Sequence, residues 1–456
     1  MNGLITGIPN QSEVINKLFQ FAQHIGGRPE QEVFFRGLCH GFSIVYGYMA
    51  ATDNLPWWAA LLTELIEWDG TEEKLNEIIS LPGAREDNPP EFPTTRRNLF
   101  LRALDYLYFH QASESLEGYL QQQTLLQKDG VFESEQGKIV HHFVAAGSFS
   151  FNDIEELLDE KIFSKEVICL IYMDTHACAF RYAEDRWFFY DPNKGKEEEY
   201  SRKSNMANRI WATAKRYNGN EFGPSNRSSL SIDIATWKQD IDFSPLSEVY
   251  TNLIDKKPID LVGGTGLHMM ACYAPAQLPN LFTLAENDTY FGKKFAASLA
   301  AKDKNEKTGL EMILRYAPDQ LDALFRLASK NEKFQIKMAR LFIFIGLKEM
   351  HECAVNEETK TIICNLVKNL NKPTSLDELK TLLDGIDSAI LPSRGNFSQG
   401  EAPKISDGSA FGHAKCLLNI SREKHLRSCA CFGLFGQPEQ QGQNVGNEKP
   451  DSCLTM

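Results

Sequence analysis

One cysteine stands in a setting that can activate a thiol. Cys39 lies between Gly37 and Gly41, and the residues from 42 to 49 are apolar and mostly small. This pattern predicts a loop that delivers Cys39 to the first turn of a buried helix, where the two glycines allow another chain to approach the backbone closely. The unpaired N–H groups and the positive dipole end of a helix N-terminus favour the thiolate, which is the nucleophilic form. Cys39 is therefore a candidate nucleophile.

A candidate base and a carboxylate follow in a predicted β-hairpin, which comes directly after a β-branched, apolar run that predicts a buried strand. The two central residues of the hairpin turn are either Ala183 and Glu184 or Glu184 and Asp185. In the first register His176 lies directly opposite Asp191, and in the second the two are diagonal neighbours on one face. Either register brings the imidazole beside the carboxylate.

Cysteine, histidine and carboxylate, in this order, are the groups needed for attack of a thiolate on an acyl carbon. The imidazole takes and returns the proton, and the carboxylate holds its tautomer and orientation. Taken alone, a cysteine before a helix is most often a small buried apolar residue, so the hypothesis depends on all three groups together. His40, His141 and His142 are rival bases, but no hairpin places a carboxylate beside them. The strand cysteines, Cys169 and Cys178, are expected in the core.

These motifs resemble the YopT/AvrPphB-type cysteine proteases, which are papain-fold effectors that bacteria deliver into host cells. The resemblance covers Gly37-x-Cys39-x-Gly41-x-Ser43, the pair His176-Ala177 in a strand, and Phe189-Tyr190-Asp191-Pro192-Asn193-Lys194-Gly195. It implies a papain-like α+β fold with Cys39 as nucleophile, His176 as base and Asp191 as the orienting carboxylate. No cofactor is implied.

The sequence identifies the hydrogen-bond donor for the oxyanion less clearly than it identifies the three catalytic groups. The Cys39 backbone N–H and an upstream amide are the usual arrangement, and a papain-like glutamine would lie six residues before the cysteine. Val33 occupies that position, and Gln31, eight residues before Cys39, is the candidate that remains.

An internal repeat follows the hairpin region. The segment 265–285 recurs 43 residues later as 308–328, with matching starts and a matching Tyr-Ala-Pro-x-Gln-Leu in each copy. Two copies this alike indicate stacked helical units that loosely resemble ankyrin repeats, although the period is longer. Equivalent residues should be buried equivalently, as in the pairs Leu281 and Leu324, and Phe282 and Phe325. More diverged helices are expected between 359 and 383.

The C-terminal tail carries candidate lipidation sites. From about residue 391, Ser, Gly, Asn, Gln and Pro dominate, which predicts disorder. The last four residues, beginning at Cys453, fit a prenylation box, and the terminal methionine favours farnesyl. Because one prenyl chain binds membranes only marginally, Cys429 and Cys431 are candidate palmitoylation sites. The alternative for this part of the tail is a short amphipathic helix that docks on the repeats.

Composition narrows the classes of function. The chain has 456 residues and a formal net charge of −13, which argues against nucleic acid as the main partner. No apolar run approaches the roughly 18 residues of a membrane span, and the polar start predicts no Sec signal. The ten cysteines are scattered without a Cys-x-x-Cys pair, as is typical of a reducing compartment. His268, His351 and Cys353 form no clear metal-ligand set.

Three domains are predicted: a papain-like cysteine protease at 1–245, an α-helical repeat domain at 246–390 and a flexible lipidated tail at 391–456. The resemblance implies a bacterial effector that is secreted into a host cell, where it cleaves a membrane-associated host protein such as a lipidated small GTPase. A host prenyltransferase would anchor the chain at the cytosolic face of a host membrane. The alternatives are a glutamine deamidase or transglutaminase with the same three residues, and a non-catalytic membrane-anchored scaffold.

Overall fold

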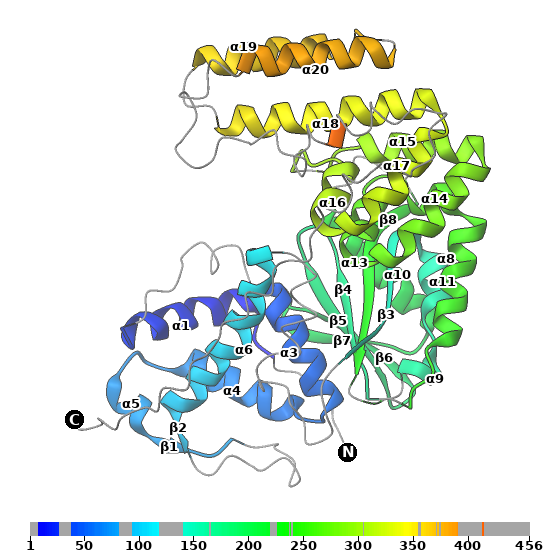
Figure 1. The fold of residues 1–456 in the computed structure, drawn as a ribbon. Coiled ribbons are helices and arrows are strands. Elements are labelled where there is room, and N and C mark those ends of the chain that lie inside the picture. The colour runs from blue at the N-terminus through cyan, green and yellow to red at the C-terminus, as the bar shows by residue number, and fades with distance from the viewer. Residues whose placement is uncertain are drawn as a thin grey trace, which may run out of the picture. The chain divides into compact units, whose positions relative to one another are not determined.

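The protein combines helices with one large antiparallel sheet, as an α+β chain does (Figure 1). The computed structural model describes residues 8–26, 38–81, 94–117, 140–163, 166–218, 226–236, 238, 240–303, 305–353, 357–370, 372–373, 375–390 and 413–414. The described chain divides into two compact units, Met1–Ala323 and Leu324–Met456, and the division falls inside helix α17 (Leu321–Ser329).

The sheet of the first unit has six strands. Their order across the sheet is β3 (Val140–Ser150), β8 (Arg227–Thr236), β4 (Ile168–Tyr172), β5 (Ala177–Ala183), β6 (Arg186–Asp191) and β7 (Lys196–Tyr200). The predicted buried strand is β4, and the predicted hairpin is β5 and β6. Strands β3, β7 and β8 are additions to the predicted set.

The hairpin register is the second of the two alternatives. Ala179 pairs with Tyr190, and the turn is made by Glu184 and Asp185. Both turn residues have positive φ values, 53° and 58°. This geometry is that of a type I′ turn, whose twist matches the twist of the flanking strands. Asp191 is therefore a diagonal neighbour of His176.

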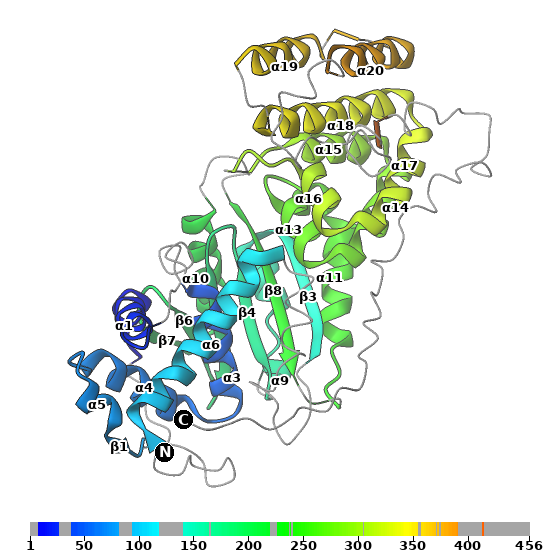
Figure 2. The same cartoon turned by 60° about the vertical axis from the view of Figure 1, so that its left-hand side comes forward.

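Helix α3 (Cys39–Ala51) packs against β4 and β5, and α4 (Leu55–Glu67) and α6 (Arg96–Glu117) pack against α3 (Figures 1 and 2). Its residues from His40 to Met49 are all buried, as the apolar sequence predicts. A Cβ atom at Gly41 would lie 2.4 Å from the Leu107 carbonyl oxygen, so α6 of this same chain uses the close approach expected there. Helix α1 (Gln11–His24) packs on α4 and α6, and α5 (Glu72–Asn76) packs on α6. The short ribbon of β1 (Ile78–Ile79) and β2 (Thr94–Thr95) contacts α6 through β2.

A second group of helices includes α10 (Lys203–Tyr217), which packs on β8, β6 and α8 (Phe151–Leu157), and α11 (Ser244–Lys256), which packs on α8 and β3. Tyr250 of α11 forms hydrogen bonds with backbone groups of the edge strand β3. Its hydroxyl donates to the Ala146 carbonyl at 2.6 Å and accepts from the Ala146 N–H at 3.1 Å. Two further short helices are α9 (Glu160–Phe163) and α12 (Pro258–Leu261).

The internal repeat produces the same order of elements twice. The first copy contains α13 (Gly266–Tyr273), η1 (Pro275–Gln277), α14 (Leu278–Asn287) and α15 (Thr289–Ala300), and the second contains α16 (Gly309–Tyr316), η2 (Pro318–Gln320), α17 and α18 (Glu332–Cys353). Leu281 and Leu324 are each 0% exposed, and Phe282 and Phe325 are 4% and 0% exposed. The predicted equivalence of these positions is confirmed.

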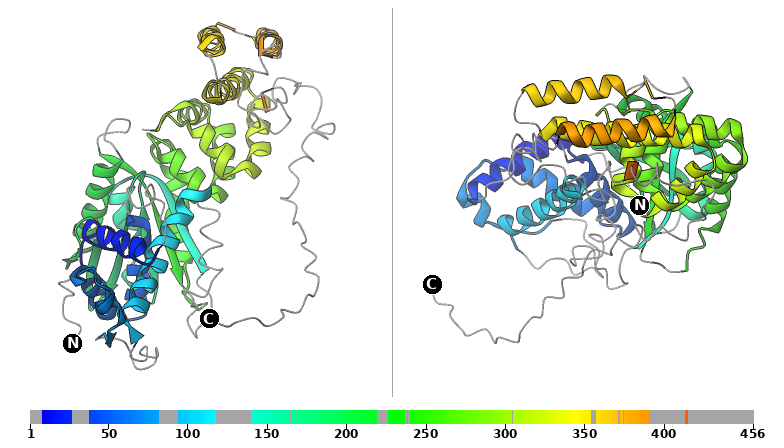
Figure 3. Two further views of the ribbon diagram at one scale, coloured as in Figure 1. Left: turned by 90° about the vertical axis from the view of Figure 1, so that its left-hand side faces the viewer. Right: turned by 45° about the horizontal axis from the view of Figure 1, so that its top comes forward.

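In the second unit, α18 contacts both α19 (Glu357–Asn369) and α20 (Leu376–Ile390), and the three helices run beside one another (Figure 3). The buried His413 packs its ring between those of Phe325 and Phe342, with centroid distances of 5.9 Å and 5.6 Å. One short part of the predicted tail therefore belongs to the core of this unit. Within the described ranges, no helix has both the length and the apolar character that crossing a membrane requires.

Candidate active site

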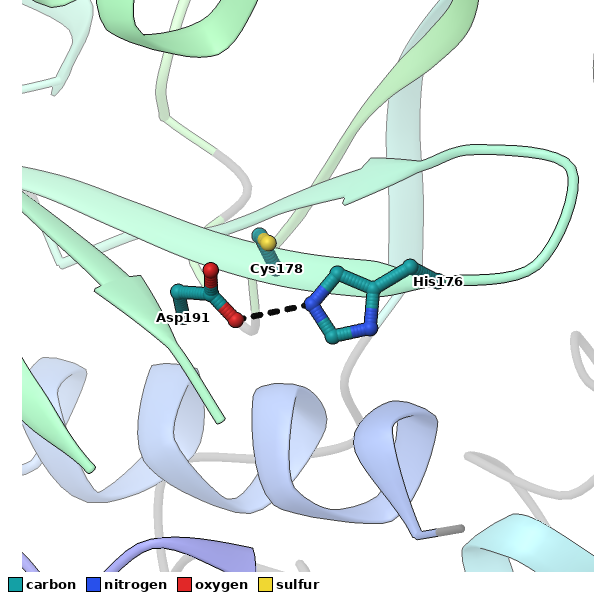
Figure 4. Close-up of side chains that lie close together, drawn as sticks. All are labelled: His176, Cys178 and Asp191. Carbon is teal, nitrogen blue, oxygen red and sulfur yellow. Dashed lines mark hydrogen bonds and ion pairs between the residues drawn. The ribbon is translucent and has the colours of Figure 1, made fainter. Parts of the chain in front are cut away.

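The candidate site is centred on a buried hydrogen bond between His176 and Asp191 (Figure 4). The His176 Nε2 atom lies 2.8 Å from Asp191 Oδ1, and the two side chains are 2% and 3% exposed. His176 stands immediately before β5, and Asp191 is the last residue of β6. The hairpin therefore brings the imidazole and the carboxylate together.

The surroundings keep Asp191 ionised. Burial alone would raise the pKa of its carboxyl, but His176, the Asn193 N–H and Arg209 outweigh burial and lower that pKa. The Asn193 N–H donates to Oδ1 at 3.0 Å, and the Arg209 guanidinium lies 3.8 Å from Oδ2. Because the carboxylate accepts, Nε2 carries the proton of a neutral imidazole, and Nδ1 is left as the proton acceptor. Figure 4 shows this second ring nitrogen pointing away from Asp191.

A tyrosine from α10 fixes the plane of the imidazole. The Tyr217 ring stacks on the His176 ring with centroids 4.0 Å apart and planes inclined by 28°. The Tyr217 hydroxyl accepts a hydrogen bond from Asn193 Nδ2 at 2.7 Å. His176 is thus held at its edge by the carboxylate and on its face by the phenol.

Cys39 is the first residue of α3 and is partly buried. Burial raises the pKa of the Cys178 thiol, and the charges of Asp191, Cys39 and Glu198 add to that effect. Helix α3, which begins at Cys39, packs on β5, which follows His176, and on β6, which ends at Asp191.

Gln11, at the start of α1, links the cysteine helix to the carboxylate turn. Its Oε1 accepts from the N–H of Leu38, the residue before Cys39, at 3.1 Å, and its Nε2 donates to Asn193 Oδ1. The Gln11 N–H also donates to the Pro192 carbonyl at 2.9 Å. No local pattern marks this role, because the two partners lie 27 and 182 positions away in sequence.

The turn after Asp191 has a physical reason for its glycine. The Lys194 and Gly195 N–H groups donate to the Asp191 carbonyl at 2.8 Å and 3.2 Å. Gly195 has a φ of +65°, and a Cβ atom there would lie 2.4 Å from the Asn10 backbone nitrogen. A glycine is therefore required both for the turn and for the close packing of α1.

The remaining predicted residues are the oxyanion and lipidation candidates, the rival bases and the two strand cysteines. Gln31, Cys429, Cys431 and Cys453 lie outside the described residues. Of the rival bases, the buried His40 stacks on Tyr172, and the exposed His142 stacks on Phe243; the side chain of His141 is not among those described. Cys169 and Cys178 are both buried in strands, as predicted.

Comparison of the chain with models of known protein families, with curated proteins and with solved structures finds no match.

Proposed function

We propose that this protein is a papain-like cysteine protease in which Cys39 is the nucleophile, His176 the base and Asp191 the orienting carboxylate. The observation that carries the proposal is the buried 2.8 Å contact between His176 Nε2 and Asp191 Oδ1, at the end of the β5–β6 hairpin, which contacts the helix that begins at Cys39. The motif resemblance to the YopT/AvrPphB-type proteases supports the same assignment.

The geometry supports a two-step acyl transfer. His176 Nδ1 accepts the Cys39 thiol proton, and the thiolate attacks the carbonyl carbon of the scissile bond. The imidazolium then gives that proton to the leaving amine, which departs as the acyl-enzyme forms. A water molecule, deprotonated by Nδ1, attacks the thioester carbon, the C–S bond breaks to release the carboxylic acid product, and the imidazolium returns its proton to the Cys39 thiolate. Throughout, Asp191 holds Nε2–H and stabilises the imidazolium.

The first turn of α3 supplies part of the charge stabilisation. Helix N-terminal N–H groups and the dipole favour negative charge, both on the thiolate and on the oxyanion that forms beside it. The Cys39 N–H is the proposed backbone donor. Gln31 remains the proposed upstream donor.

The proposed substrate is a host protein at a membrane, and the chain itself is proposed to be a bacterial effector that is prenylated at Cys453 by a host enzyme. The helical repeats would select the partner. Confinement of enzyme and substrate to one membrane surface would raise their effective concentration without any new contact.

Terminal-peptide proteomics of host membranes exposed to the wild type and to Cys39→Ala tests the proposal. We expect new peptide termini with the wild type and none with the variant. A thiol-directed electrophile should label the wild type at Cys39. Equal sets of termini from both proteins would refute proteolysis, and intact-mass analysis of the candidate substrate would then reveal deamidation. Absence of Cys39 labelling would instead favour a non-catalytic scaffold.

A further inference from the structure

A third side chain adjoins the imidazole–carboxylate pair. Cys178 lies on β5, two residues after His176, and Figure 4 shows its sulfur beside the Asp191 carboxylate. The Cys178 sulfur, a His176 ring nitrogen and an Asp191 oxygen all lie within 4.8 Å of one another, and all three residues are buried. The catalytic scheme above gives Cys178 no task.

The donor set is that of a transition metal. Zn²⁺ binds imidazole and carboxylate at about 2.0 Å and thiolate at about 2.3 Å, so a tetrahedral site with one thiolate separates these ligand atoms by about 3.3–3.5 Å. Side-chain shifts of about 1 Å or less would therefore close the present group around an ion. A thiolate ligand disfavours Mg²⁺ and Ca²⁺, which prefer oxygen.

The residues around the group also suit a metal. The Asn193 N–H donates to Asp191 Oδ1, which orients the carboxylate as hydrogen bonds from outside a metal site commonly do. Tyr217 holds the imidazole plane from its face. Three protein ligands would leave the fourth tetrahedral position for water or for an added thiolate.

We infer that His176, Cys178 and Asp191 form an inhibitory binding site for a divalent transition metal, with Zn²⁺ as the best fit. The inhibitory part of this inference rests on the proposed function, whereas the binding part does not.

The proton transfers that accompany metal binding explain the inhibition. When Zn²⁺ binds Nε2 and the Cys178 sulfur, the thiol proton goes to solvent and the imidazole proton moves from Nε2 to Nδ1. The ring then has no free nitrogen to accept the Cys39 proton. Removal of the metal by a chelator reverses both transfers and restores the base.

Zinc binding to the full chain tests the site. Wild type, Cys178→Ala and the control Cys169→Ala, which removes an equally buried cysteine from β4, are freed of metal and titrated with Zn²⁺ against a chromophoric chelator. We expect one equivalent to bind to the wild type and to the control, and at least about 100-fold weaker binding to Cys178→Ala, since loss of a ligand costs more than loss of an outer-shell partner. Unchanged affinity in Cys178→Ala, or no binding to the wild type, would overturn the inference.

Two further measurements guard against a misfolded variant and against failure of the proposed function. Co²⁺ bound to the wild type should give a thiolate-to-metal charge-transfer band that survives in Cys39→Ala; loss of the band in that variant would assign the thiolate ligand to Cys39 and contradict the inference. In activity assays, each protein is compared with its own metal-free rate. Zinc should inhibit the wild type and Cys169→Ala but not Cys178→Ala. Equal inhibition of all three proteins would contradict an inhibitory role for the proposed metal site. A chain that binds zinc but has no hydrolase activity would refute only the proposed function.

Discussion

At the scale of single residues, the hydrogen bond of Asp191 decides what His176 can do. The carboxylate selects the tautomer in which Nε2 carries the proton and Nδ1 accepts one, and Tyr217 holds the ring in the matching plane. Catalytic competence in the proposed mechanism depends on this orientation as much as on the nucleophile.

Asp191→Asn should therefore reduce kcat/KM on a peptide substrate about 10³- to 10⁴-fold while leaving the fold intact, because the amide fills the same space but no longer fixes the productive tautomer. Cys39→Ala and His176→Ala should each abolish turnover. Steady-state kinetics with circular dichroism on the same samples measures both effects. An active Cys39→Ala variant would end the proposal.

Gln11 acts at this scale as a positioning residue. Gln11→Ala removes the hydrogen bonds that tie Leu38 to Asn193, so we expect Cys39 alkylation by a thiol-directed electrophile to slow about 10-fold or more, since misplacement of reacting groups by about 1 Å can cost about 100-fold. Mass spectrometry at timed intervals follows the reaction.

The exposed Gln20 on the same helix provides the control. Gln20→Ala should alkylate like the wild type. If Gln11→Ala lowers the thermal midpoint but alkylates at the normal rate, Gln11 has only a structural role.

At the scale of elements, ion pairs and hydrogen bonds of buried carboxylates join helices to the sheet. Asp153, which is 0% exposed, completes the capping box of α8 by accepting from the Ser150 N–H, and it binds Lys257 Nζ and Arg227, each at 2.7 Å. On the other face, Glu197 of β7 lies 3.0 Å from Arg181 Nε and accepts a hydrogen bond from Tyr46 of α3. Ionic partners thus compensate the burial of charge at the sheet on both sides.

Asp153→Asn should lower the free energy of unfolding at pH 7 by about 2–3 kcal/mol, somewhat less than a fully buried pair is worth because Lys257 is partly exposed. Burial raises the pKa of this carboxyl, but Lys257, Ser150 and Arg227 outweigh burial and lower it. The stabilisation is therefore complete above the unfolded pKa of about 3.9 and is lost as the pH falls through the lower folded pKa.

Denaturant unfolding between pH 7 and pH 3 checks this pH dependence. The difference between wild type and Asp153→Asn should shrink on acidification. Glu156→Gln, at an exposed position of the same helix, should have little effect at any pH. A difference that persists undiminished at the acid end would show that the charge of Asp153 is not what stabilises the wild type.

At the scale of the whole molecule, the predicted boundary at 245/246 is crossed by strong contacts. Lys257 and Tyr250, from the predicted repeat domain, bind Asp153 and the Ala146 backbone of the predicted protease domain. The first compact unit accordingly extends to Ala323 and contains the whole first repeat copy. The three-domain division itself stays a prediction.

Localisation is a property of the whole chain, and the tail prediction belongs here. If Cys453 is farnesylated, Cys453→Ser should move the protein from membranes to the cytosol, while activity on a soluble peptide should remain unchanged. Cell fractionation of the two proteins measures the first effect, and a peptide assay measures the second. Mass spectrometry that finds an unmodified terminus still ending in Leu454-Thr455-Met456, together with unaltered localisation of Cys453→Ser, would contradict the lipid anchor.

Replacing Cys429 and Cys431 together should weaken membrane retention without preventing transient visits, because a single prenyl chain binds reversibly. Recovery of fluorescence after photobleaching of a tagged chain measures this exchange. Retention equal to that of the wild type would contradict a role for Cys429 and Cys431 as a second membrane signal.

The sequence by itself determined the features that local periodicity and turn chemistry control. It predicted β4, the hairpin of β5 and β6, the adjacency of His176 and Asp191, and equivalent burial in the two repeat copies. It missed β7, whose run of glutamates has low strand propensity, because the partners that compensate Glu197 come from α3 and β5. The alternation of Leu230, Ile232 and Ile234 with polar residues is a strand signal that does mark β8.

Only the tertiary structure decided the contacts between distant segments. It selected the hairpin register from two alternatives that both satisfied the local pattern. It also brought Gln11 to the turn after Asp191, and it placed the Cys178 sulfur beside the His176 imidazole and the Asp191 carboxylate. A sequence pattern reports which face of an element is apolar, but the partner across a sheet or between layers depends on how whole elements pack, and packing is a property of the complete chain.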